Sequence, residues 1–251
     1  MRKTLVATIL AGLIATPAMA ADVVVFCPGA VQSVVRELVK SYEQKTGNTV
    51  RFEFGTAGAV AKRVAEGAQG DVVLATNSGL AKLATQGKVD GASIRDLGSM
   101  GVGVAVKAGA AKPDIHDVES FKKSMLAAKS IMYANPAKGG QSGIYVAKVF
   151  AEIDLDKQIT SKVQLRDRGP DGLKEVAKGE IEIGLGQISE IIANKDVVLV
   201  GPFPAAIQGA VTFSGAVHAG STNKKAAEEL LQLLVTPAAK EKFKALGFTV
   251  S

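Results

Sequence analysis

The feature that most constrains the fold is a repeated alternation of short apolar runs with longer amphipathic stretches. Six runs are almost wholly apolar, at residues 23–26, 72–75, 102–106, 131–134, 181–185 and 197–200. Strands that are apolar on both faces are typical of parallel sheets covered by helices. The sequence therefore predicts an α/β protein.

The stretches between these runs have helical periodicity. Val31 and Leu38 belong to the apolar face of the first expected helix, which ends at Gly47. Further helices are expected over residues 57–66, from 137–143 onward, over 170–179, after an N-cap at Ser221-Thr222, and from Pro237 to Gly247. Residues 50–54 alternate between apolar and charged side chains, which predicts a half-buried strand.

Two segments depart from the parallel pattern. Residues 101–107 and 211–217 are long runs, each followed by small residues, as expected of strands that cross between two lobes. We therefore predict two lobes, each a mostly parallel sheet flanked by helices, joined by the two crossing strands and separated by a cleft. The expected boundaries place lobe I at residues 21–103 plus 206–251 and lobe II at residues 104–205.

Residues 1–20 predict a secretory signal peptide. Arg2 and Lys3 precede a short apolar segment, and the motif A-M-A at residues 18–20 is a small-residue cleavage site. The apolar segment is too short to cross a bilayer. The mature chain is expected to begin at Ala21 and to be a soluble protein of the periplasm.

Composition argues against nucleic-acid binding and against metal chemistry. The formal net charge is +6, or +4 without Arg2 and Lys3, and tryptophan is absent. Basic residues are spread along helices, so the basic stripes and stacking platforms of nucleic-acid binders are missing. His116 and His218 stand alone, without metal-ligand spacing. We expect no cofactor, no protein-ligated metal, and a small anionic ligand favoured by the mild positive charge.

The single cysteine, Cys27, lies at an expected strand-to-helix turn. A lipid anchor is disfavoured because Phe26 precedes it and the cleavage site lies upstream. A nucleophilic role would need His116 or His218 as its base, and nothing local supports such a pair, so we favour a buried thiol. Asp167, which lies between two arginines, is more simply a charged loop residue than a catalytic acid.

Glycine-rich turns follow several of the predicted strands, at residues 27–31, 55–58, 139–143, 169–172 and 186–189. In open α/β sheets, ligands bind beyond the carboxyl ends of the strands, where such turns gather. Each following helix presents unpaired N–H groups and a partial positive charge. Any one of these turns is explained as well by tight chain reversal. Their recurrence favours a donor-rich site for an oxyanion.

With these motifs in place, the chain resembles the periplasmic molybdate- and tungstate-binding proteins of ABC importers, a branch of the type II periplasmic binding proteins. The resemblance rests on "FEFGTAGAVAKRVAEGAQGDVVLAT" from Phe52, "NPAKGGQSGIYVAKVF" from Asn135 and "FKALGFTV" from Phe243. It implies two α/β lobes that close on a small oxyanion without catalysis. It also implies a monomeric receptor that delivers its ligand to an ABC permease in the inner membrane.

The resemblance and the glycine-rich turns together place the ligand-binding residues at Gly29, Ala30, Val31, Thr56, Ala57, Gly58, Gln141, Ser142, Arg168, Gly169 and Gln187. The molybdate binders normally donate serine hydroxyls from the first two turns, whereas this chain has alanine at both of these positions, 30 and 57. Thr56 is a candidate replacement donor, and Gln187 stands at the position of a family tyrosine.

The missing hydroxyls leave two versions of the ligand open. Each hydrogen bond to a charged oxygen contributes about 1.5–3 kcal/mol, so the loss of two donors weakens the case for molybdate or tungstate. Arg168 can grip a carboxylate through two parallel N–H bonds, or it is simply an exposed loop arginine. The family pattern favours the oxyanion and the missing serines favour an organic carboxylate. An enzyme or a sensor built on the same fold is the alternative from another class.

Overall fold

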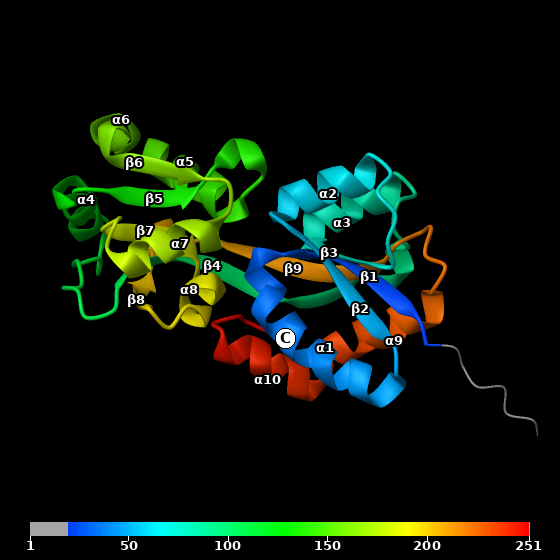
Figure 1. The fold of residues 1–251 in the computed structure, drawn as a ribbon. Coiled ribbons are helices and arrows are strands. Elements are labelled where there is room, and N and C mark those ends of the chain that lie inside the picture. Colours follow the sequence, from blue (N-terminus) through cyan, green and yellow to red (C-terminus); the bar gives the residue numbers. More distant parts are fainter. Residues whose placement is uncertain (1–19, 251) are drawn as a thin grey trace, which may run out of the picture.

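A computed structural model describes residues 20–250, and its elements form two lobes side by side (Figure 1). The predicted signal peptide lies outside the described residues except for Ala20. Lobe I contains β1 (Asp22–Pro28), α1 (Gly29–Thr46), β2 (Thr49–Gly55), α2 (Ala57–Ala65), β3 (Val72–Thr76), α3 (Asn77–Thr85), β9 (Ala210–Val217), α9 (Lys224–Leu234) and α10 (Pro237–Ala245).

Lobe II contains α4 (Val118–Ala127), β5 (Ile131–Ala134), α5 (Gln141–Glu152), α6 (Asp156–Ile159), β6 (Val163–Arg166), α7 (Gly169–Lys178), β7 (Ile183–Gln187), α8 (Ile188–Ala193) and β8 (Val197–Pro202). The long strand β4 (Arg95–Lys107) belongs to both lobes. Short 3₁₀ turns lie at η1 (Gly91–Ser93), η2 (Pro136–Lys138), η3 (Thr160–Lys162) and η4 (Ala205–Ile207).

The strands form one continuous sheet in the order β2-β1-β3-β9-β4-β7-β5-β6, and β8 also pairs with β4. β1 is parallel to β2 and β3, and β5 is parallel to β6 and β7. β4 pairs antiparallel with β9 through residues 95–101 and with β7 through residues 102–105. The predicted α/β fold with antiparallel strands crossing between two lobes is therefore confirmed, and the lobe boundaries at 103/104 and 205/206 stay a prediction.

Two local expectations were wrong, and one strand was missed. Residues 197–200, expected in a parallel strand, lie in β8, which is antiparallel to β4, because apolarity reports burial and not strand direction. The edge strand β6 was not expected, since its sequence VQLR is half polar. The N-cap of α9 is Asn223 and not Ser221-Thr222, because the Ser221 hydroxyl donates to Asp71 Oδ1 at 2.6 Å instead.

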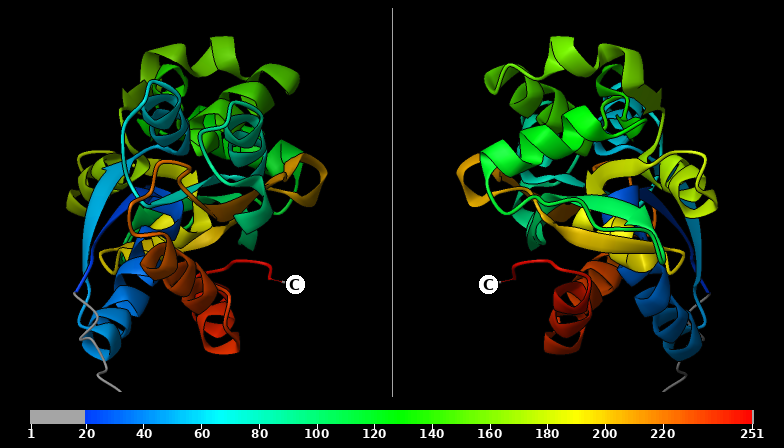
Figure 2. Two further views of the ribbon diagram at one scale, coloured as in Figure 1. Left: turned by 90° about the vertical axis from the view of Figure 1, so that its right-hand side faces the viewer. Right: turned by 90° about the vertical axis from the view of Figure 1, so that its left-hand side faces the viewer.

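Each lobe has a core on both faces of its part of the sheet. In lobe I, α1, α9 and α10 cover one face and α2 and α3 the other (Figure 2). Leu230 and Phe243 are fully buried on the first of these faces. In lobe II, Phe121, Phe150 and Val149 are buried under α4 and α5, and a smaller cluster lies beneath α7 and α8.

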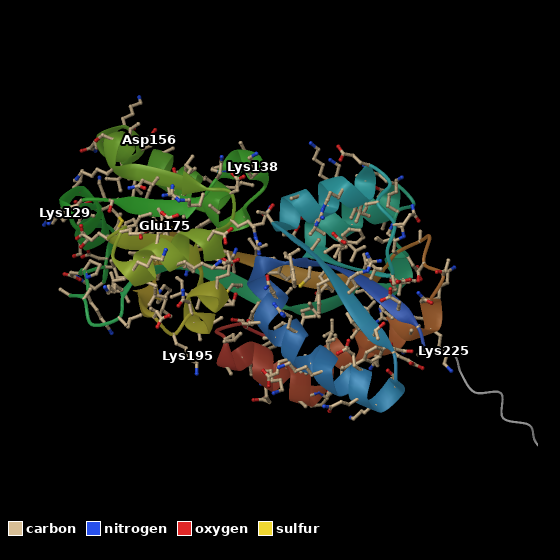
Figure 3. The ribbon with its side chains drawn as sticks, in the orientation of Figure 1. Lys129, Lys138, Asp156, Glu175, Lys195 and Lys225 are labelled. Carbon is tan, nitrogen blue, oxygen red and sulfur yellow. The ribbon has the colours of Figure 1, made fainter. Side chains whose placement is uncertain are left out.

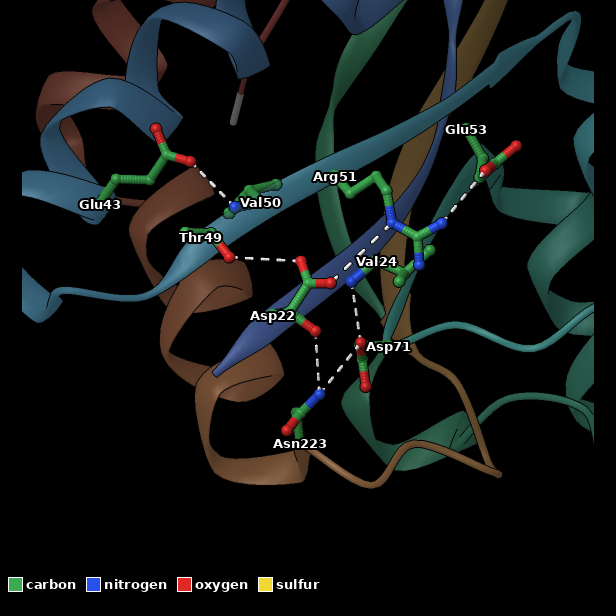
Figure 4. A network of polar contacts seen from close by, with 9 residues as sticks. All are labelled: Asp22, Val24, Glu43, Thr49, Val50, Arg51, Glu53, Asp71 and Asn223. Carbon is green, nitrogen blue, oxygen red and sulfur yellow. Dashed lines mark hydrogen bonds and ion pairs between the residues drawn. The ribbon is translucent and has the colours of Figure 1, made fainter. Parts of the chain in front are cut away.

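A polar network anchors lobe I at the N-terminal end of β1 (Figure 4). Asp71 accepts hydrogen bonds from Val24 N at 2.8 Å and from the Ser221 hydroxyl, and Asn223 Nδ2 lies 3.5 Å from it. This buried carboxylate therefore joins β1, the loop before β3 and the start of α9. Because the carboxyl ends of the strands lie at the opposite end of β1, the network is structural.

None of the helices in the described part of the chain combines the length and apolarity that crossing a membrane requires.

Candidate functional site

Four helices begin around one chamber between the lobes. α1 and α2 come from lobe I, and α5 and α7 come from lobe II. The first N–H groups of a helix have no backbone partner within the helix and carry partial positive charge, so helix starts from both lobes can offer donors to an anion. On α2, however, Gly58 N and Ala59 N are already bonded to Gly139 O and to the Thr56 hydroxyl. The chamber is small, about 30 Å³.

The structure brings most of the predicted site residues to this chamber. Those that line it are Gly29, Ala30, Thr56, Ala57, Gln141, Ser142, Arg168, Gly169 and Gln187. Val31 instead packs, fully buried, in the lobe I core. Gly58 lies against the other lobe, where its N–H donates to Gly139 O at 3.1 Å. A Cβ on Gly58 would lie 2.7 Å from Gly139 Cα, so only glycine permits this approach.

Cys27 is a packed strand-end residue beside this chamber. Its side chain is fully buried, and its thiol donates to Pro28 O at 3.6 Å. Burial raises the pKa of the Cys27 thiol, against the smaller effect of nearby Arg36 and Arg168. Burial and a raised pKa both disfavour the thiolate, which is the nucleophilic form of cysteine.

The Thr56 hydroxyl is not available as the replacement donor that we expected. It accepts a hydrogen bond from Ala59 N at 3.0 Å as the N-cap of α2, and it donates its single proton to Lys138 O at 2.6 Å. Lys138 lies on the edge of lobe II that faces α2 (Figure 3). Thr56 therefore serves to join the lobes.

Further hydrogen bonds hold the lobes closed. The Ser189 hydroxyl on α8 donates to Ala30 O on α1 at 2.7 Å, and both residues are buried. Arg168 lies within 3.4 Å of Gln32 Oε1 on α1. With the contacts of Thr56 and Gly58, these bonds span the cleft on more than one side, so the structure shows the closed form.

Two buried polar side chains line the chamber without a partner. Gln187 is 4 % exposed, and its Oε1 has no hydrogen bond among the described residues. Ser142, also 4 % exposed, lies in the first turn of α5, and no described residue bonds to its hydroxyl. Buried polar groups are normally paired, so both groups are candidates to contact a ligand.

Two charged residues are present among the described residues that line the chamber: Arg168 and Glu190. Arg168, predicted from the sequence, is the N-cap residue of α7. Glu190, on α8, was missed. A Cβ on Gly29 or on Gly169 would collide with a carboxyl oxygen of Glu190, so this carboxyl is clamped between the first residues of α1 and α7.

The electrostatics of Glu190 are unusual for a carboxylate. Burial raises its pKa from 4.5 to about 7, although Arg168 acts in the opposite direction, and Asp171 contributes a smaller increase. No described residue donates a hydrogen bond to its carboxyl or forms an ion pair with it. Perturbed carboxyls of this kind concentrate at functional sites. The sequence signal was a lone acidic residue in the apolar segment "GQISEIIA".

A wide groove of about 1290 Å³ lies outside the chamber and shares Gly29, Arg168, Pro170 and Glu190 with it. Its cationic lining residues are Arg36, Lys40, Lys107, Arg168, Lys174, Lys178 and Lys195. Its acidic ones are Glu37, Asp171, Glu190 and Asp196. Lys195, one of these lining residues, lies at the lower edge of lobe II (Figure 3). The groove is therefore basic and leads to the chamber at Glu190.

The other candidates from the sequence lie away from the chamber. Asp167 is exposed and lies 3.9 Å from Lys138 Nζ, as a charged loop residue. His116 is exposed between Asp114 and Asp117, and His218 is buried, with its Nδ1 accepting from Gly220 N. Neither histidine is among the residues that line the chamber, and the hydrogen bond of the Cys27 thiol goes to Pro28 O. No metal-binding cluster of His, Cys, Asp and Glu occurs within residues 20–250.

The fold and the chamber define a two-lobed binding protein that closes on a small ligand. Residues 23–249 match the family described as bacterial extracellular solute-binding protein. The chain belongs to this family, and the predicted kinship with the molybdate-binding type II periplasmic proteins is confirmed.

The names of individual relatives point to different small molecules. The aconitate isomerase of a Pseudomonas species is 34% identical over 246 residues, which cover 93% of this chain and 90% of that protein. The molybdate-binding protein ModA of Azotobacter vinelandii is 27% identical over 249 residues, 97% and 96% of the two chains. The solved periplasmic molybdate-binding protein of Azotobacter vinelandii superposes with a TM-score of 0.76 at 19% identity, covering 92% of this chain and 99% of that one.

Proposed function

We propose that this protein is a periplasmic receptor that binds a small organic polycarboxylate between its lobes. The observation that carries the proposal is the pair of charged residues at the chamber, Arg168 and Glu190, in a wall that lacks free hydroxyls at Ala30, Thr56 and Ala57. The guanidinium of Arg168 matches the planar fork of a carboxylate, which a tetrahedral oxyanion does not require.

Glu190 also disfavours a compact dianion such as molybdate. Its carboxyl lies at the chamber wall, where all four oxygens of a tetrahedral anion would be close to it. When Glu190 is ionised, a like charge about 5 Å away costs roughly 3 kcal/mol at an effective dielectric constant of about 20, and a dianion doubles this cost. An organic acid avoids most of it by placing a carbon atom beside Glu190 and its carboxylates on Arg168 and the helix N-termini.

The basic groove supports a ligand with more than one carboxylate. It joins the chamber at Arg168 and carries further cations on α1, such as Arg36 and Lys40. A branched polycarboxylate can place one group in the chamber and another toward the groove. The Pseudomonas relative, by its name, acts on aconitate, an unsaturated tricarboxylate, and we adopt aconitate as the probe for the ligand class.

Closure of the lobes distinguishes the ligand-bound receptor from the empty one. The interlobe bonds of Thr56, Ser189 and Arg168 form only when the lobes meet, so ligand binding and closure are linked. We infer that the closed form docks on an ABC permease of the inner membrane, which takes up the ligand. A monomeric receptor that enters the periplasm after cleavage of its signal peptide fits this role.

Calorimetric titration tests this proposal. Purified protein lacking residues 1–20 is titrated with cis-aconitate, trans-aconitate, citrate, molybdate and tungstate. We expect the tricarboxylates to bind more tightly than either oxyanion. Replacing Arg168 with alanine should weaken aconitate binding by about 10- to 150-fold, the equivalent of one charged hydrogen-bonding group at about 1.5–3 kcal/mol.

The matched control is Arg51→Ala. Arg51 lies on β2 at the far end of lobe I, 61% exposed in its side chain, within 4.0 Å of Asp22 and Glu53 (Figure 4). This control should leave affinity unchanged. Molybdate binding that is tighter than that of every carboxylate would overturn the proposal.

A further inference from the structure

Glu190 has no structural partner that explains its position. It neither caps a helix nor forms an ion pair among the described residues, although it lies at the starts of α1 and α7. The two glycines that accommodate it, Gly29 and Gly169, come from different lobes. The Glu190 carboxyl is therefore held in a fixed position, but it forms no hydrogen bond or ion pair with a described residue that would stabilise the fold.

Glu190 lies where a ligand bound between the lobes would contact it. Glu190 lines both the chamber and the basic groove, so it lies where the two volumes join. Arg168 lines both volumes as well, and the buried, unpartnered Gln187 Oε1 belongs to the chamber wall just before α8. Arg168 and Glu190 therefore line the same two volumes, where one residue can bind a ligand carboxylate while the other contacts a neighbouring carbon.

We propose that Glu190 is a catalytic acid–base group that isomerises a bound unsaturated polycarboxylate by moving one proton between two of its carbons. The inference rests on the proposed binding of such a ligand. It departs from our expectation from the sequence, which was binding without catalysis.

The proposed reaction needs only the ligand and the Glu190 carboxylate, because the proton that is removed is also returned. The Glu190 carboxylate removes a proton from a CH₂ group that lies between a carboxylate and a C=C bond, so the C–H bond breaks and an O–H bond forms. The electron pair spreads over the three-carbon allylic unit and its carboxylates, where Arg168 and the N-termini of α1 and α7 stabilise it. Glu190 then returns the proton to the other end of this unit. The double bond has moved, and no oxidant, reductant or second substrate is consumed.

The acidity of Glu190 suits this task. A base works best when its pKa lies near the working pH, and burial raises the pKa of Glu190 to about 7. The charged residues that line the groove with Glu190 come from α1, the end of β4, the turn before α7, α7 itself and the loop after α8. They are Arg36, Glu37, Lys40, Lys107, Arg168, Asp171, Lys174, Lys178, Lys195 and Asp196. Of these, Arg168 favours the ionised form of Glu190, whereas Asp171 acts with burial to raise its pKa.

The test follows interconversion of cis- and trans-aconitate by chromatography, with affinity measured on the same samples. The wild-type protein should interconvert the isomers, with kcat/KM rising with pH and levelling above about pH 7. Glu190→Gln should lower kcat by at least about 100-fold while Kd changes less than tenfold, because acid–base catalysis typically contributes 10²–10⁴-fold. Glu190→Asp should retain part of the turnover with an altered pH profile. The control Glu228→Gln, on the exposed side of α9, should behave as wild type.

The outcomes separate the two proposals. Wild-type protein that binds aconitate without isomerising it overturns this inference and leaves the binding proposal standing. Turnover that survives in Glu190→Gln also overturns the inference. Wild-type protein that binds none of the tricarboxylates overturns the binding proposal, and this inference with it.

Discussion

Replacing Glu190 with glutamine should stabilise the protein at alkaline pH, which is the reverse of the usual effect of removing a carboxylate. The pKa of Glu190 is raised from 4.5 to about 7 by burial. The folded state therefore holds its proton more tightly than the unfolded state, and the stabilisation is fully present below about pH 4.5. It is lost as the pH rises through 7, where the folded protein must ionise a buried carboxyl.

The magnitude follows from the two pKa values. A difference of about 2.5 between them corresponds to about 3 kcal/mol. The carboxyl lies against Gly29 and Gly169, but Glu190 as a whole residue is partly exposed, so solvent reduces this figure and we expect about 1–2 kcal/mol. Glutamine has nearly the same shape and never ionises. The variant should match the wild type near pH 4.5 and exceed it by about 1–2 kcal/mol above pH 7.

Urea unfolding followed by far-UV circular dichroism measures this difference, since the chain has no tryptophan for fluorescence. Curves are taken between pH 4.5 and 8.5 for the wild type, Glu190→Gln and the exposed control Glu228→Gln. The control should differ from the wild type by less than about 0.5 kcal/mol at every pH. A Glu190→Gln variant that is less stable than the wild type at pH 8, or whose difference does not vary with pH, would refute the reasoning.

Three further changes test other parts of the cleft. Gly29→Ala should cost about 1–3 kcal/mol of unfolding free energy because its Cβ collides with Glu190, and the cost should largely vanish in a Glu190→Ala background, as a double-mutant cycle would measure. Ser189→Ala removes the bond to Ala30 O and should raise the Kd for aconitate about 2- to 10-fold by calorimetry, whereas an unchanged Kd would contradict a role in closure. Cys27 should resist iodoacetamide at pH 8 in native protein and react fully in urea, as mass spectrometry would show; rapid native alkylation would contradict its burial.

The backbone of the fold could be predicted from the sequence because burial leaves a direct trace in residue type. The run Ile131–Ala134 is apolar on both faces and forms a strand with a neighbour on each side, and Pro237 starts the last helix as expected. The edge strand β6 carries no such trace, because one side of it is open to solvent. The direction of β8 is set by its pairing with β4 and leaves no mark in its composition.

The site was predictable to the extent that it is built from backbone. Glycine-rich turns before helices located the starts of α1, α2, α5 and α7, and these do meet at one chamber. Side-chain roles were harder to predict. Thr56 has the right chemistry for a ligand donor, yet its proton is taken by Lys138 O, a contact 82 residues away in the sequence. Glu190 reaches the start of α1 only because α8 packs against α1 in the folded protein. The residues next to it in the sequence therefore could not predict its role.

The central claim is that the cleft selects a polycarboxylate through Arg168 and Glu190. Its most direct test is a crystal structure of the wild-type protein grown with equal concentrations of cis-aconitate and molybdate, with data collected at the molybdenum absorption edge. The account predicts a carboxylate of the organic acid on the Arg168 guanidinium, its CH₂ group or double bond facing Glu190, and no anomalous peak between the lobes. A molybdenum peak in the chamber, held by the N-termini of α1, α2, α5 and α7, would contradict it.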